Sequence, residues 1–172
     1  MGCSQSKEGL ISDDILTGDG QDFLEKYNVE RILGEGEFGV VKLVTPKDEK
    51  KVQCAAKILR KGMVFKDNTL YSAIKPKVLQ MECKILQTLA GKHYCLKLLG
   101  IYESQSVIYI VSDLCSGGDM FHYVGDAYGN TSSGEELALR TEDVSRISYQ
   151  LFDAVNHCAV HGIIHRDIKV SE

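Results

Sequence analysis

The sequence predicts an α+β fold in which three short strands come first, a helix and two further strands follow, and another helix comes last. Residues 27–33, 40–44 and 52–59 are rich in β-branched and aliphatic residues and are separated by glycines or a polar turn, which is typical of strands. Apolar residues then recur at helical spacing over 78–89 and over 144–158. The chain therefore combines strands and helices.

The length fits one domain of ordinary size or one and a half small ones, and the composition is that of a globular protein. The chain has 172 residues, of which 44% are apolar and 26% charged. Its net charge of −4 gives no broad basic field, so we expect no nucleic-acid partner. The six cysteines include no C-x-x-C pair and nothing resembles a secretory signal, so we expect reduced thiols in a cytosolic setting. No apolar run approaches the ~20 residues that a membrane span requires.

The stretch from Gly34 to Val41 reads G-E-G-E-F-G-V-V and contains the spacing G-x-G-x-x-G. Glycine lets a backbone approach a ligand with no Cβ in the way, and its N–H groups can face phosphate oxygens. The same spacing occurs in the dinucleotide-binding turn, where the loop opens a helix and an acidic residue ends the next strand. Here residues 40–44 look like a strand and not a helix. The place of the acidic residue, at 54–57, reads C-A-A-K. We therefore predict the tip of a β-hairpin.

Two charged residues follow the glycines. Lys57 lies in the strand predicted over 52–59, and Glu82 lies beside the apolar stripe of a helix predicted from Pro76 to Gly91. On an ordinary amphipathic helix such a glutamate would simply border the buried face. Together with the glycines, however, the lysine and the motif E-C-K-I-L resemble eukaryotic protein kinases. The resemblance implies that Lys57 holds the α- and β-phosphates of ATP and that Glu82 pairs with Lys57.

Two further strands, predicted over 96–102 and 107–111, lead into S-D-L-C-S-G-G-D. By itself Gly117-Gly118 could be a turn after an edge strand. After the upstream motifs, the stretch resembles the hinge between kinase lobes.

The resemblance gives the hinge residues specific roles. Ser112 would be the gatekeeper beside the adenine, the backbone of Asp113 and Cys115 would hydrogen-bond the adenine, and Asp119 would lie near the ribose. The nucleotide-binding set implied in this way comprises Leu33, Gly34, Glu35, Gly36, Glu37, Phe38, Gly39, Val40, Val41, Ala55, Lys57, Ser112, Asp113, Cys115 and Asp119.

Residues 125–140 are rich in Gly, Ser and Asn and predict a variable loop. A helix over 142–160 follows, with Thr141 as its expected N-cap and Gly162 as its stop signal. The motif H-R-D-I-K then ends at Lys169 and resembles the kinase catalytic loop. By that resemblance Asp167 accepts the proton of the substrate hydroxyl and Lys169 contacts the transferring phosphate, as is typical of serine/threonine kinases. ATP, Mg²⁺ and a protein substrate are implied.

The pattern departs from the family after Lys169. Val170 replaces the usual proline, Glu172 stands where an asparagine would hold Mg²⁺, and no D-F-G aspartate follows. We therefore expect an inactive fragment of a kinase, with phosphotransfer belonging to a longer protein. One alternative is a catalytically dead, membrane-tethered module that binds nucleotide or a partner. Another is a chain that does not fold stably, because the apolar stripe of the helix at 142–160 would be exposed.

Three histidines suggest a metal site that we do not expect to exist. His157, His161 and His165 are spaced four apart, and histidines at i and i+4 can share a zinc ion. Gly162 ends the helix before His165, and no further ligands complete a four-ligand set.

The N-terminus begins M-G-C-S-Q-S, which fits N-myristoylation at Gly2, with Cys3 as a candidate for palmitoylation. We expect an acylated flexible tether over 1–26 and a partial kinase domain over 27–172, with the N-lobe at 27–112 and the start of the C-lobe at 113–172. The resemblance implies that the N-lobe is a five-stranded antiparallel sheet with the helix that kinases call helix C, and that the first helices of the C-lobe follow. The expected location is cytoplasmic and membrane-associated. An acylated N-terminus with this hinge is similar to calcium-dependent protein kinases, although the sequence contains no EF-hand loop.

Overall fold

The computed structural model describes residues 10–12, 14–36, 39–49, 51–61, 64–66, 69–71, 76–129 and 140–169. These form two compact units. The sheet unit contains the described residues up to Ala90 together with Leu96–Leu114, and the helical unit contains Gly91–Cys95 and the described residues from Cys115 onward.

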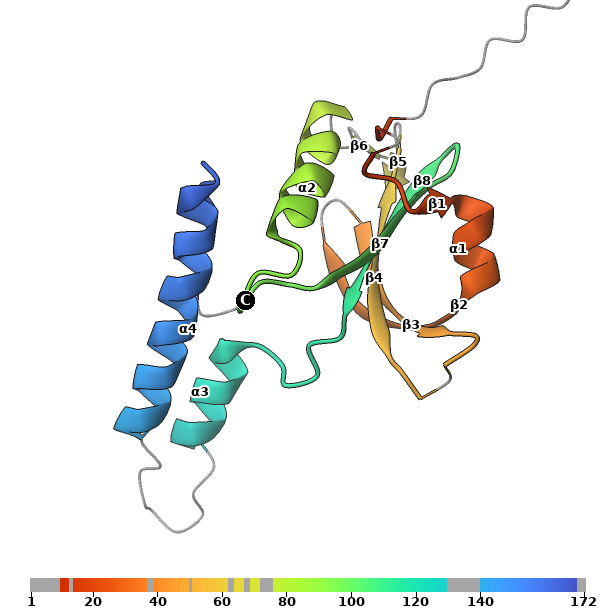
Figure 1. Cartoon of the computed structure of the whole chain (residues 1–172). Helices are drawn as coiled ribbons and strands as arrows, with labels where there is room; N and C mark the ends of the chain where they lie inside the picture. Colours follow the sequence, from red (N-terminus) through yellow and green to blue (C-terminus); the bar gives the residue numbers. More distant parts are fainter. Residues whose placement is uncertain are drawn as a thin grey trace, which may run out of the picture. The chain divides into compact units, whose positions relative to one another are not determined.

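The sheet unit is built on a mixed sheet of six strands in the order β1-β7-β8-β4-β3-β2 (Figure 1). Five of them pair antiparallel with their neighbours in the predicted manner, and β1 is an additional strand parallel to β7. The bounds are β1 (Gly18–Asp19), β2 (Tyr27–Gly36), β3 (Gly39–Pro46), β4 (Cys54–Arg60), β7 (Leu98–Glu103) and β8 (Val107–Asp113). The predicted kinase-like sheet is confirmed. A separate hairpin, β5 (Val64–Lys66) and β6 (Thr69–Tyr71), lies where the sequence predicted no element.

Alternate residues of β4 enter two different cores, because successive side chains of a strand point to opposite faces. Leu59 belongs to a cluster with Leu79 and Cys83 of helix α2 (Pro76–Leu89). Cys54 and Ala56 belong to a second cluster, which includes Phe23 of helix α1 (Gly20–Lys26). The two helices therefore cover opposite faces of the sheet (Figure 1).

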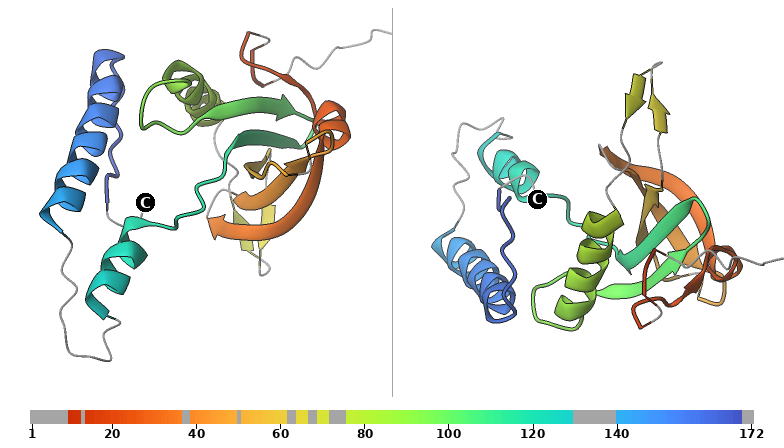
Figure 2. Two further views of the ribbon diagram at one scale, coloured as in Figure 1. Left: turned by 60° about the horizontal axis from the view of Figure 1, so that its bottom comes forward. Right: turned by 90° about the horizontal axis from the view of Figure 1, so that it is seen from above.

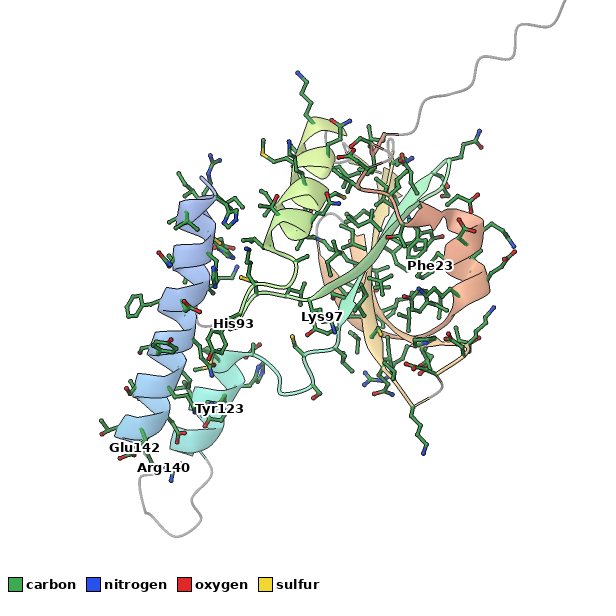
Figure 3. The ribbon with its side chains drawn as sticks, in the orientation of Figure 1. Phe23, His93, Lys97, Tyr123, Arg140 and Glu142 are labelled. Atoms are coloured by element: carbon green, nitrogen blue, oxygen red, sulfur yellow. The ribbon has the colours of Figure 1, made fainter. Side chains whose placement is uncertain are left out.

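Residues 10–26 are not the flexible tether that we predicted. Ile11 is buried in the α2 cluster, and α1 begins with a capping box in which Asp19 accepts the Gln21 and Asp22 amides while Asp22 accepts the Asp19 amide. Phe23 is fully buried and stacks on Tyr109, with ring centroids 4.1 Å apart (Figure 3). A few apolar residues among the acidic ones order this segment, because Ile11 packs on one face of the sheet and Phe23 on the other.

The helical unit contains α3 (Met120–Gly129) and α4 (Thr141–Val160). Two predictions about them were wrong. Helix α3 continues into the predicted loop at 125–140, of which residues 130–139 lie outside the described part. The N-cap of α4 is Arg140, which has extended backbone and no side-chain capping bond, so Thr141 is already helical.

The predicted stop at Gly162 is confirmed. Its φ of +69° lies in the left-handed region that glycine tolerates. The Gly162 amide donates to the Ala159 carbonyl and the Ile163 amide to the Cys158 carbonyl, which is a Schellman ending. No residue of α4 is buried, and Phe152 is 71% exposed. Among the described residues, no helix has the length and apolar character needed to cross a membrane.

We expect Phe23→Ala to lower the free energy of unfolding by about 3–5 kcal/mol, since it removes a buried aromatic ring and leaves a cavity. Urea unfolding monitored by circular dichroism measures this change. The control is Leu24→Ala on the same helix, whose side chain is 49% exposed. Equal small losses for both variants would mean that α1 does not contribute to the folded sheet unit.

Candidate functional site

The glycine-rich stretch forms the end of a β-hairpin, as predicted. Strands β2 and β3 pair antiparallel, and the last partners are Gly36 and Gly39. Strands β2, β3 and β4, orange to yellow in Figure 2, lie side by side. Because β3 is a strand, the dinucleotide-binding alternative, which needs a helix at this point, is excluded. Glu37 and Phe38 at the tip lie outside the described residues.

The three glycines have different surroundings. A Cβ at Gly39 would lie 2.3 Å from the carbonyl oxygen of Ile58, so packing against β4 requires glycine there. Among the described residues, a Cβ at Gly34 or Gly36 would meet no atom within 4 Å beyond its chain neighbours. Neither of these two has a positive φ. Internal packing therefore explains Gly39 and leaves Gly34 and Gly36 unexplained.

Lys57 and Glu82 form the ion pair that the family resemblance implied. Nζ of Lys57 on β4 lies 2.5 Å from Oε1 of Glu82 on α2. The two side chains are 41% and 29% exposed. An ion pair this open to water stabilises a fold by about 1 kcal/mol or less. The main effect of the pair is therefore on geometry, because it holds the Lys57 ammonium group at one place above the sheet.

The lysine and the glycines are in register. Gly34 pairs with Val41, and Val41 pairs with Lys57, so the three lie on one line across β2, β3 and β4. Neighbouring strands are about 4.8 Å apart, which places the Gly34 backbone about 10 Å from that of Lys57. Glu35 and Val40 are partners in the same hairpin, and Leu33 precedes it on β2. A chain of phosphates could therefore lie between the hairpin backbone and the ammonium group.

Of the residues predicted to contact adenine, Ala55, Ser112 and Asp113 lie close together in the sheet unit. Ala55 on β4 is the register partner of Ser112 on β8, and Ser112 is buried. The Ser112 hydroxyl donates to the Asp113 carbonyl at 3.2 Å. The Asp113 amide donates to the Lys97 carbonyl at 3.1 Å. The Asp113 carbonyl accepts the Ser112 hydroxyl and has a second lone pair, which is suited to the adenine amino group. Cys115 belongs to the helical unit.

Asp119 has a local role in the helical unit. Its carboxylate accepts the His122 amide and the His122 ring Nδ1, both at 2.8 Å, at the start of α3. These hydrogen bonds, from the amide first and the ring second, lower the pKa of the Asp119 carboxyl. The group therefore caps a helix, whereas the sequence suggested only a contact with ribose.

Asp167 and Lys169 lie together after α4. Nζ of Lys169 is 2.7 Å from Oδ2 of Asp167, and both side chains are exposed. Between them and the helix, Arg166 adopts a φ of +71°. Left-handed backbone costs a non-glycine residue roughly 1–2 kcal/mol and is common at functional loops. The loop therefore places the Asp167 carboxylate, which can act as a base, next to the Lys169 ammonium group.

The described residues contain no group of three His, Cys, Asp or Glu side chains arranged to hold a metal ion. His161 Nδ1 lies 2.7 Å from the His157 carbonyl oxygen, and His157 Nε2 lies 3.5 Å from Asp153 Oδ2, so each ring has a local partner. Glu172 and Val170 lie outside the described residues.

Sequence reasoning missed one charged cluster. The buried carboxylate of Glu103 on β7 receives the Lys61 ammonium group and the amides of Leu10 and Ile11. The apolar pairs at residues 10–11 and 15–16, four to five residues apart, were the available signal for a docked segment.

Comparisons with known proteins agree with this geometry. A family model of the protein kinase domain matches residues 27–172. Serine/threonine-protein kinase SIK2 of Gallus gallus is 32% identical over 143 residues, which cover 83% of this chain and 16% of that protein. CDPK-related kinase 5 of Arabidopsis thaliana is 27% identical over 168 residues, which cover 96% of this chain and 26% of that protein. The chain thus spans less than a third of the length of either relative.

The glycine hairpin, the Lys57–Glu82 pair and the H-R-D-I-K loop all lie within the residues that this family model matches. The chain belongs to the protein kinase family, and the relatives that it matches are serine/threonine kinases.

Proposed function

We propose that the sheet unit binds ATP and that the chain carries part of a serine/threonine kinase, which transfers the γ-phosphoryl group of ATP to a protein hydroxyl. The observation that carries this proposal is the register line from Gly34 through Val41 to Lys57. On this line Gly34 presents backbone with no side chain in front of it, and Glu82 holds the Lys57 ammonium group in place. These are complementary to a polyanionic chain of phosphates.

Each residue has a distinct chemical task in this proposal. The hairpin backbone donates N–H groups to phosphate oxygens, and Lys57 neutralises part of their charge. Glu82 restricts the ammonium group to one position, which lowers the entropic cost of holding the phosphates. Ala55 and Ser112 border the adenine, and the Asp113 carbonyl accepts from its amino group.

In the helical unit, Asp167 orients the substrate hydroxyl and accepts its proton while Lys169 contacts the phosphoryl group. Kinases of this family also use Mg²⁺, which screens phosphate charge. Glu172, at the position where the family has an asparagine that holds Mg²⁺, lies outside the described residues.

We expect ATP to raise the melting temperature of the 172-residue chain, because a ligand that binds only the folded state stabilises it, by about 2.7 kcal/mol at a hundredfold excess over Kd. Lys57→Met removes the cation and should abolish most of this shift. Differential scanning fluorimetry with and without ATP measures both. Lys84→Met, an exposed lysine on the same helix as Glu82, is the control and should retain the shift.

Absence of a shift in the unmodified chain, or an equal shift in Lys57→Met, would refute the ATP site. A shift without transfer of labelled phosphate is expected both of a partial kinase and of a binding module without catalysis. A longer form of the protein separates the two: phosphate transfer that is lost in Lys57→Met would favour the kinase, and a longer form that binds ATP without transfer would favour the binding module.

The glycines allow a second test that separates packing from binding. Gly36→Ala should leave the urea midpoint almost unchanged and weaken ATP binding, because its Cβ would meet no atom of the described residues within 4 Å but would stand where the ligand approaches. Gly39→Ala should instead lower the free energy of unfolding by about 1–3 kcal/mol, since its Cβ would overlap the Ile58 carbonyl. An unchanged ATP affinity in Gly36→Ala would show that this glycine does not face the ligand.

We also propose that Gly2 is myristoylated and Cys3 palmitoylated, which would place the protein at a cytoplasmic membrane surface. The support is the N-terminal sequence alone, and both residues lie outside the described part. One myristoyl chain binds a membrane only marginally, so a second acyl group is needed for stable association. Mass spectrometry of the N-terminal peptide from native cells should show both acyl groups, whereas an unmodified Gly2 would contradict the proposal.

A further inference from the structure

Residues 10–12 and 14–17, here termed the docked segment, are hydrogen-bonded to strand β7 at two places. The Leu10 and Ile11 amides donate to the two carboxylate oxygens of Glu103, at 2.6 and 2.8 Å. Seven residues on, the Thr17 amide donates to the Ile101 carbonyl at 2.7 Å, and the Ile101 amide donates to the Thr17 hydroxyl at 2.8 Å. The segment is therefore fixed to the sheet at both of its ends.

The same segment is hydrogen-bonded to α2. Gln80 donates from Nε2 to the Leu10 carbonyl at 2.5 Å, and Gln87 donates from Nε2 to the Asp14 carbonyl at 3.0 Å. The two glutamines are seven residues apart, which is two helical turns, so they lie on one face of α2. That face is the one turned toward the docked segment.

Apolar contacts reinforce these hydrogen bonds. Ile11 is 2% exposed and shares its cluster with Leu79 and Cys83 of α2 and with Ile101 of the sheet. Leu86 of α2 and two further residues of the segment, Ile15 and Leu16, pack against the same cluster. Ile11 thus lies in the core that joins the helix to the sheet.

The carboxylate of Glu103 is suited to hold the segment. Burial alone would raise its pKa, but the hydrogen bonds from Lys61 and then from the Ile11 and Leu10 amides outweigh burial and lower it. Glu103 is therefore ionised at neutral pH, and its bonds to the two amides are charge-assisted, which makes them stronger than neutral ones.

We propose that the docked segment positions α2 and thereby sets the geometry of the Lys57–Glu82 pair, with Ile11 and Glu103 as positioning residues. Glu82 directly precedes Cys83, which is fully buried in the Ile11 cluster. A shift of α2 against the sheet would move Glu82 with it, while Lys57 stays on β4. The inference rests on the proposed ATP site only for its consequence in nucleotide binding.

Hydrogen exchange of the nucleotide-free chain tests the positioning step by itself. Ile11→Ala should increase amide exchange in α2 by about tenfold or more relative to the unmodified chain, because truncating a buried isoleucine loosens the contacts that it makes. Phe23→Ala, in the cluster on the other face of the sheet, is the matched control. It should not raise exchange in α2 above that in β4. Ile11→Val, which keeps most of the side chain, should restore protection.

The ion pair itself has a separate readout. Acylation of Lys57 by an N-hydroxysuccinimide ester, followed by peptide mass spectrometry, reports how tightly Glu82 holds the ammonium group. Ile11→Ala should acylate several-fold faster at Lys57, with no change at the exposed Lys84, and Phe23→Ala should leave the ratio of the two rates unchanged. Equal exchange in α2 and an equal Lys57 rate in Ile11→Ala and Phe23→Ala would overturn the proposal.

A second variant keeps the test decisive if Ile11→Ala does not fold. Gln80→Ala combined with Gln87→Ala removes only exposed side chains and should still increase α2 exchange and Lys57 acylation. If neither readout changes in this variant, the segment does not position the helix. ATP titration of the same variants is interpreted separately. If the unmodified chain does not bind ATP, the proposed function is refuted. The exchange and acylation results then still decide whether the segment positions α2.

Discussion

The alternation of side chains along β4 is the constraint on which the sheet unit depends. Each strand residue must face one side or the other, so Cys54 and Ala56 enter the aromatic cluster under α1 while Leu59 enters the cluster under α2. Lys57 shares the face of Leu59 and therefore points toward α2, where Glu82 meets it. A one-residue slip of β4 would remove both cores and the ion pair together. The requirements of folding and of the candidate site are thus met by the same register.

The N-terminal segment uses both of these faces. It contacts α2 through Ile11, follows the β7 edge through β1, and reaches the opposite face with Phe23. These contacts explain why this stretch is ordered although it is rich in acidic residues and glycines. A Cβ at Gly20 would lie 2.6 Å from the Ser104 side chain, so this glycine permits close passage at the edge. The segment therefore belongs to the sheet unit as much as the strands do.

Strands β2, β3, β4, β7 and β8, the helices α2 and α4, and the glycine hairpin were predictable because each is encoded locally, by side-chain period or by glycine and proline. Strands β1, β5 and β6 were not predicted. The Lys57–Glu82 contact joins residues 25 apart and followed only from family resemblance. The docked segment was missed because its order comes from long-range partners, since Glu103 lies more than ninety residues from Leu10 and Ile11. The error at Thr141 was smaller. Composition favours Thr as an N-cap, but Arg140 has the extended backbone and an ion pair to Asp143.

Stability and function make different demands on the charged residues, and burial tells them apart. Glu103 is almost fully buried with three donors around it, and removing it would leave donors unpaired in the core. Lys57 and Glu82 are far more exposed, so their pair adds little to stability. Fold stability accounts for Glu103, yet it gives no comparable reason for a lysine and a glutamate at positions 57 and 82. The geometry of the glycine hairpin supplies one, since open backbone at Gly34 and Gly36 and a fixed ammonium group on the same register line are what a phosphate chain requires.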